Sequence, residues 1–203
     1  MPAHGTLRRG AAVALLGALL LASCGDDDDD PLIGVSDAPY EVTLPEGWSE
    51  GTDEEKEQLG LQAGAAFEEA AGAEIDVSGV GVTSLWLRGE PAPETPSAVV
   101  IAEPIPEGFG DEEFVSVSLS NAERAFAQQL VAGPRKVTDS PVAGVPAPTF
   151  DYRIRFGDRE LAKRAVFILR DDTAYTLTLT ALPEDFDGAA SELDEILATW
   201  TWS

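Results

Sequence analysis

The 203-residue sequence contains one histidine, one methionine and one cysteine, and these are His4, Met1 and Cys24. The chain that follows Cys24 therefore has no imidazole and no thiol. This absence excludes from that part of the chain Ser-His and Cys-His nucleophiles, histidine proton shuttles, metal sites with imidazole or thiolate ligands, and disulfides. Glycine-rich phosphate loops and the GxSxG pattern are also absent. A pair of carboxylates is the catalytic device that remains open.

Long apolar runs are lacking too, and the longest is the 12-residue segment "AAVALLGALLLA" at residues 11–22. It suits the apolar region of a signal peptide and is shorter than the roughly 20 residues that span a membrane. Arg8 and Arg9 precede it, with no acidic residue before them. The stretch that follows, Leu21-Ala22-Ser23-Cys24, resembles the bacterial lipobox. The resemblance implies that the Cys24 sulfur receives a diacylglyceryl group and that cleavage makes Cys24 the first mature residue.

The aspartate run Asp26–Asp30 follows this cysteine. Adjacent like charges repel each other and keep such a run extended and solvated, so residues 24–37 are predicted to be an acidic tether. A calcium loop would space its ligands around a glycine turn, which consecutive aspartates do not do. Two acyl chains on Cys24 hold a protein firmly at a membrane without help from basic residues.

Basic residues are few, at 13 against 37 acidic ones. Loss of Arg8 and Arg9 with the signal peptide leaves 11 basic residues and a formal net charge of −26. Such a chain repels the phosphates of nucleic acids and of anionic lipids. We therefore expect no nucleic-acid partner.

The first half of the predicted domain contains strands and helices in alternation. A strand is predicted within residues 38–50 from the alternation of Tyr40, Val42 and Leu44. Thr52 and Glu55 form a capping-box pattern that starts a helix predicted to end at Gly72. Two further strands are predicted at residues 82–87 and 98–102.

Residues 111–131 have two interpretations. The letters "FVSVSL" alternate like a strand, whereas an apolar stripe from Val115 to Leu130 fits one helix that ends at Gly133-Pro134. We prefer the helix.

The last third predicts an antiparallel meander followed by a helix. Three strands are expected, at residues 147–156, at residues 160–170 and after Asp171-Asp172, with apolar side chains inside and polar ones outside. Apolar residues then recur at helical spacing, so that Leu193 and Leu197 are predicted to face the sheet and Asp194 to point away. The predicted class is α+β, an antiparallel sheet with helices packed on it.

Three stretches of this domain carry a family resemblance. They are "YEVTLPEGW", "SPVAGVPAPTFDYRI" and "DDTAYTLTLTALPEDFDGAASELDEILATW". In this order they resemble PsbP-like domains, and the lipidated, acidic style is similar to actinobacterial Lpq lipoproteins of the LpqN type. The resemblance implies an α/β/α sandwich over residues 38–203 that acts by binding, without catalysis or a cofactor. The predicted organisation is then a signal peptide at 1–23, the tether at 24–37 and this domain.

Six of the 11 remaining cations lie within 18 residues, namely Arg153, Arg155, Arg159, Lys163, Arg164 and Arg170. Alternation places Arg153 and Arg155 on the solvent side of their strand, and a suitable register would add Arg164 and the row Thr176, Thr178, Thr180 to that face. One interpretation is a solvated face whose arginines pair with local acids. The other is a docking face for an anionic partner.

The leading functional prediction is an extracytoplasmic envelope lipoprotein held at the cell membrane by a lipid on Cys24. Its domain would be a non-catalytic protein-interaction module with an envelope protein as partner. Two alternatives stay open. A carrier or sensor of a small apolar ligand would need a cavity between helix and sheet, and a carboxylate-pair hydrolase would need two facing acids.

Overall fold

The computed structural model describes residues 33–61, 79–90, 92 and 95–203. The predicted signal peptide, Cys24 and most of the acidic tether lie outside these residues, as does the predicted helix beyond residue 61. In the described part of the chain, no helix has the length and apolar character needed to cross a membrane.

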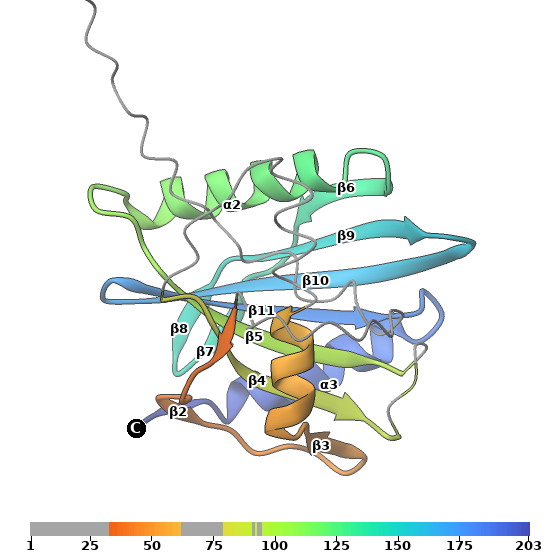
Figure 1. Ribbon diagram of the computed structural model, residues 1–203, viewed down its shortest axis with the longest axis horizontal. Helices are drawn as coiled ribbons and strands as arrows, with labels where there is room; N and C mark the ends of the chain where they lie inside the picture. Colours follow the sequence, from red (N-terminus) through yellow and green to blue (C-terminus); the bar gives the residue numbers. More distant parts are fainter. Residues whose placement is uncertain (1–32, 62–78, 91, 93–94) are drawn as a thin grey trace, which may run out of the picture.

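One large sheet forms the centre of the domain (Figure 1). Among the described residues it has eight strands in the order β1-β4-β5-β11-β10-β9-β6, with β3 also paired to β4. Their bounds are β1 Gly34–Val35, β3 Trp48–Glu50, β4 Gly81–Arg88, β5 Ser97–Pro104, β6 Leu130–Lys136, β9 Thr149–Phe156, β10 Arg159–Arg170 and β11 Thr173–Ala181. Of the strand pairs described in this sheet, β1 with β4 is parallel and the others are antiparallel. Two small sheets join β2 (Tyr40–Glu41) to β12 (Thr201–Trp202) and β7 (Ser140–Val142) to β8 (Val145–Ala147).

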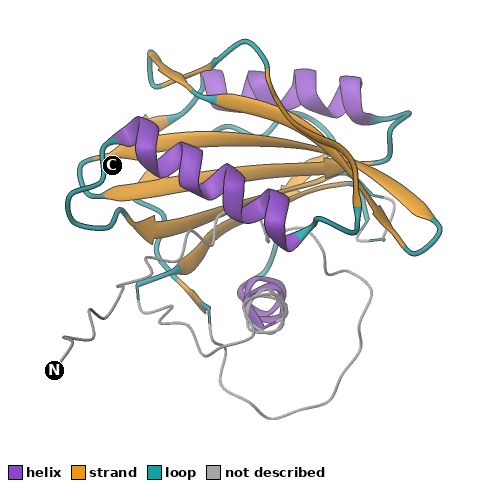
Figure 2. Ribbon diagram, turned by 90° about the horizontal axis from the view of Figure 1, so that it is seen from above, coloured by secondary structure: helices purple, strands orange, loops and turns teal. Residues whose placement is uncertain are grey.

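Helices cover both faces of this sheet. Helix α3 (Phe186–Ala198) lies on one side, and a helix described over residues 53–61 lies on the other (Figures 1 and 2). Helix α2 (Asp111–Ala125) packs on the same face as the 53–61 helix, over β9 and β10. The predicted α+β class and the three-layer order helix, sheet, helix are therefore confirmed.

Three apolar clusters fill the spaces between these layers. The α3 side buries Leu193 and Leu197 of the helix against Leu177 and Leu179 of β11. The α2 side buries Phe114 and its neighbours against β9 and β10, and a third cluster lies beneath the 53–61 helix on β4 and β5. Complete burial of a leucine stabilises the fold by about 1.5–3 kcal/mol, so α3 is held mainly by its inward face, as predicted.

Contacts with distant segments hold α3 and the residues that follow it. The Glu192 carboxylate accepts hydrogen bonds from the Trp48 indole N–H at 2.6 Å and from the Arg88 guanidinium at 2.7 Å. Near the other end, the Tyr40 ring stacks on Trp200 with centroids 3.8 Å apart. These contacts join the helix to segments that lie far from it in sequence.

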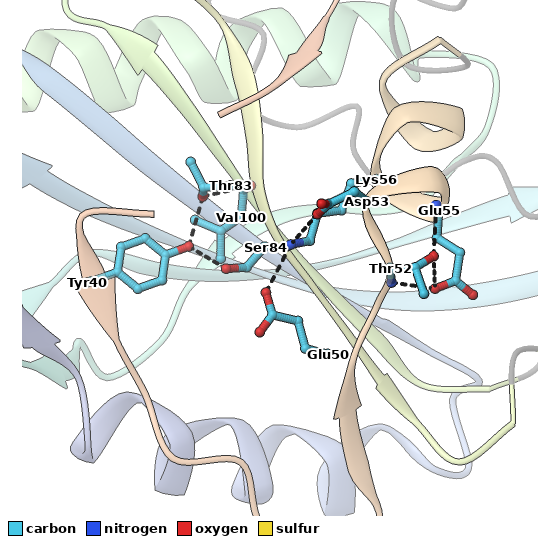
Figure 3. A network of polar contacts seen from close by, with 9 residues as sticks. All are labelled: Tyr40, Glu50, Thr52, Asp53, Glu55, Lys56, Thr83, Ser84 and Val100. Carbon is cyan, nitrogen blue, oxygen red and sulfur yellow. Dashed lines mark hydrogen bonds and ion pairs between the residues drawn. The ribbon is translucent and has the colours of Figure 1, made fainter. Parts of the chain in front are cut away.

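The 53–61 helix begins with the predicted capping box (Figure 3). The Thr52 hydroxyl accepts from the Glu55 amide at 3.2 Å, and the Glu55 carboxylate accepts from the Thr52 amide at 2.7 Å. Further along, Gly60 lies against β1 so closely that a Cβ there would be 2.1 Å from the Ile33 carbonyl oxygen. This contact explains why a glycine occupies this position of the helix.

Two predicted elements are wrong in extent. Helix α2 ends at Ala125, because the Gln129 and Leu130 amides both donate to the Phe126 carbonyl at 2.8 Å and turn the chain into β6. Leu130 packs on the same cluster as α2 but from a strand, which is why it extended the helical stripe. The strand predicted from the alternation of Tyr40, Val42 and Leu44 is shorter, since β2 covers Tyr40–Glu41 and pairs with the two residues of β12.

Candidate functional site

The arginines predicted as a docking face lie on the hairpin of β9 and β10. Gly157, with φ +62°, occupies the tight turn between the two strands. Tyr152 and Ile154 of β9 point into the α2 cluster. Arg153 and Arg155 alternate with them and so lie on the opposite face, as predicted from the sequence.

Arg153 and Arg155 share one carboxylate. The Arg153 Nη1 atom is 3.3 Å from Glu160 Oε1, and the Arg155 Nη2 atom is 3.5 Å from Glu160 Oε2. Their side chains remain 54% and 59% exposed. Exposed pairs of this kind contribute at most about 1 kcal/mol, so both guanidinium groups can be recruited by another anion at low cost.

Arg164 lies on the same face but is a structural residue. Its Nε and Nη2 atoms donate to the two Asp151 oxygens at 2.8 and 3.1 Å, and its Nη1 atom is 3.5 Å from Asp194 Oδ2. The guanidinium carbon also lies 5.7 Å from the centre of the Phe186 ring. The hydrogen bonds to Asp151 raise the pKa of Arg164. With 15% of its side chain exposed, it has little capacity for a partner.

The orientation of Asp194 differs from the prediction because Asp194 also pairs with Arg164. It was expected to point away from the sheet, but its carboxylate meets Arg164 and accepts a hydrogen bond from the Ser140 hydroxyl at 3.0 Å. On α3, Asp194 lies next to the buried apolar residues, and not opposite them. The β7–β8 hairpin, which sequence patterns did not predict, supplies its partner.

The threonine row of β11 is not on the arginine face. Thr176, Thr178 and Thr180 point to the side of the sheet that carries α2, because the alternating Leu177 and Leu179 pack against α3. All three threonines are buried. The predicted polar exterior of the meander is wrong here because helices cover both faces of the central strands.

Arg135 is a residue of this face that sequence reasoning missed. It lies on β6 opposite Asp151 of β9, which places it on the same face as Arg153, and it is exposed. The sequence pattern assigned residues 111–131 to one helix and so predicted no strand at β6. Arg135 reaches this face only through the pairing of β6 with β9. We use the name arginine face for Arg135, Arg153 and Arg155.

The other three clustered cations are elsewhere or already engaged. Lys163 lies on the opposite face and is fully buried. Arg170 lies 4.4 Å from the ring centre of Trp202 and 3.7 Å from Asp171. Arg159 is exposed at the hairpin tip. Within the described ranges, no three acidic, histidine or cysteine side chains gather as metal ligands.

Solved structures resemble this fold. LpqN of Mycobacterium tuberculosis, described as involved in cell envelope biogenesis, aligns with 12% identity over 80% of this chain and 82% of its own, with a TM-score of 0.45. CyanoP, a PsbP protein of Synechocystis sp. PCC 6803, aligns with 17% identity over 90% and 99%, with a TM-score of 0.46. PA94 of Pseudomonas aeruginosa, of unknown function, aligns with 25% identity over 62% and 85%, with a TM-score of 0.44.

The chain is similar in structure to LpqN and to CyanoP. These represent the two groups that its sequence resembles. No family model matches the chain, and no curated protein does.

Proposed function

We propose that the protein is a lipid-anchored envelope lipoprotein whose domain binds an acidic protein partner on the arginine face. The anchor rests on the sequence alone: a 12-residue apolar segment leads into Leu21-Ala22-Ser23-Cys24. Two acyl chains on Cys24 would hold the domain at the extracytoplasmic side of the cell membrane.

The exposure of Arg153 and Arg155 is the observation that carries the binding proposal. In a chain with 37 acidic residues, these two guanidinium groups share a single carboxylate and stay more than half exposed. Arginine binds carboxylates with a planar fork of donors, and a local basic patch attracts and orients an acidic partner. The partner chemistry is therefore a surface rich in aspartate and glutamate.

A binding role fits this face better than hydrolysis. Its carboxylates, Glu160, Asp151 and Asp194, are each paired with an arginine. A carboxylate-pair hydrolase needs two acids that face each other across the scissile bond, one of them protonated. Acids that are each engaged by a guanidinium group do not form such a pair with one another.

The anchor is tested by Cys24→Ser. Wild-type protein should partition into the detergent-rich phase after phase separation, and the variant should stay unprocessed or be released. Wild-type protein in the aqueous phase would contradict the lipid anchor.

The docking face is tested by Arg153→Glu with Arg155→Glu, and Arg164 is left unchanged because it is already paired with Asp151 and Asp194. The matched control is Arg124→Glu with Lys136→Glu, which changes the net charge equally at two exposed positions away from this face. After unchanged melting is confirmed, the three proteins are cross-linked in envelope preparations at low and high salt. We expect a salt-sensitive adduct that the control keeps and the arginine variant loses. An adduct kept by all three proteins would refute the docking face.

A further inference from the structure

A row of polar side chains crosses the middle of the sheet on the face opposite the arginine face. Lys163 of β10 pairs in register with Thr180 of β11 on one side and with Tyr152 of β9 on the other, and Thr180 pairs with Ser97 of β5. Residues paired in this way share a face, with Cβ atoms about 4.5–5.5 Å apart. All four side chains are buried. We call them the polar row.

Lys163 is a buried amine without a carboxylate partner. Its side chain is 0% exposed, and its one hydrogen bond in the described structure is from Nζ to the Thr180 hydroxyl at 3.1 Å. Lys56, the other buried lysine, is paired with carboxylates, as buried lysines usually are. Its Nζ atom lies 2.9 Å from Glu50 and 3.5 Å from Asp53 (Figure 3). An ammonium has three donors, so the Lys163 amine is far from satisfied.

Hydroxyl groups near this amine are also left without partners. Tyr152, directly opposite Lys163, has a buried hydroxyl with no hydrogen-bond partner, and so does Thr178, the next inward residue of β11 after Thr180. Ser118 presents another from α2. Each such buried group costs about 1–3 kcal/mol unless a bound molecule satisfies it. An ammonium supplies only donors and each of these hydroxyls can donate as well, so one oxyanion could accept hydrogen bonds from several of them.

We propose that the polar row is a binding site for a small oxyanion, a carboxylate or phosphate group held by the Lys163 amine and the Tyr152 and Thr180 hydroxyls. Charge-assisted hydrogen bonds to such an anion are about twice as strong as neutral ones and stronger still in a dry interior. The site is separate from the arginine face, since the two lie on opposite faces of the sheet.

The surroundings of Lys163 make it sensitive to such an anion. Burial lowers the pKa of Lys163 to about 7 and raises that of Tyr152. Tyr152 is the titratable neighbour on its face of β9, and the inward side of α2 presents only apolar residues and Ser118. Glu103 lies six residues along the sheet, roughly 20 Å away, and Asp151 belongs to the other face. Compared with these described groups, a bound oxyanion would be the closest charge that favours the protonated amine.

The test measures melting of the purified full chain in acetate, in inorganic phosphate and in chloride at equal ionic strength and pH 7. Phosphate stabilises most proteins by exclusion from their surface, so the comparison is between variants. Wild type and Lys56→Met should gain melting temperature in acetate or phosphate along a saturating curve, and Lys163→Met should not. The anion that produces the gain identifies the ligand as a carboxylate or a phosphate.

Titration of wild-type protein with ¹³C-labelled lysine provides the second measurement. With a saturating anion, the pKa of Lys163 should rise by at least one unit, which corresponds to tenfold tighter binding to the charged amine. Equal melting shifts in wild type and Lys163→Met, together with an unchanged Lys163 pKa, would overturn the site and leave water as the occupant of the row.

Discussion

Replacement of Lys163 by methionine should stabilise the protein, and the gain should depend on pH. Between pH 7.5 and 9.5 the buried amine is mostly neutral, because burial lowers its pKa to about 7 from an ordinary value of 10.5. In the unfolded chain the same amine is charged, so the unfolded state binds one more proton. The stability of the wild type therefore rises with pH by up to about 1.4 kcal/mol per unit from this residue, or about 2.7 kcal/mol over two units.

Methionine has a similar length and no proton to lose, so Lys163→Met lacks this slope. The variant should be more stable than wild type at pH 7.5, and its advantage should shrink by about 2–3 kcal/mol by pH 9.5. Urea unfolding in buffers free of phosphate and carboxylates measures both. The range stops below pH 10 because a second group would titrate above it. Burial raises the pKa of Tyr40 from 10.0 to about 12, so between pH 10 and 12 this tyrosine loses its proton in the unfolded state first and the stability of the folded state falls. An advantage that stays constant with pH would refute the reasoning.

Two further predictions concern packing. Leu197→Ala removes a fully buried side chain beneath α3 and should cost about 2–5 kcal/mol in urea melts, while Glu195→Ala on the exposed side of that helix should be nearly silent. Equal losses would contradict the orientation of α3. Gly60→Ala should lower the melting temperature, since its Cβ would meet the Ile33 carbonyl at 2.1 Å, whereas Gly188→Ala in open space should add about 0.5–1 kcal/mol. A tolerated alanine at Gly60 would show that β1 does not lie against this helix.

The pattern of apolar and polar residues correctly predicted those strands that pair with the next strand along the chain. Strands β9, β10 and β11 are joined by short turns, so alternation and turn residues were sufficient to place them. The capping box at Thr52 and Glu55 likewise depends on residues three apart. The position of Arg153 and Arg155 opposite the buried Ile154 follows from the same local rule.

What the sequence could not supply is which faces are covered. Alternation separates Thr178 from Leu177 but does not say that both sides of β11 are buried, and this depends on two helices from distant parts of the chain. Because the sequence does not show which faces are covered, it groups Lys163 with the surface cations. The strand register instead places Lys163 between Thr180 and Tyr152 on a covered face. Arg135 joined the site through the pairing of β6 with β9, a contact that leaves no local signal.

The pairing of β2 with β12 ties the beginning of the described chain to its last residues. Trp202 lies opposite Tyr40, the Ser203 amide donates to the Pro39 carbonyl at 2.9 Å, and the Tyr40 hydroxyl reaches Thr83 and Ser84 at 2.8 Å. A pulling force on the segment before Gly34 would first load the parallel β1–β4 pair in shear and then this closure. Mechanical unfolding from that side thus has to detach the last strand together with the first ones. A domain drawn away from a surface by its N-terminal side would therefore lose the β1–β4 pairing before the closure of β2 on β12.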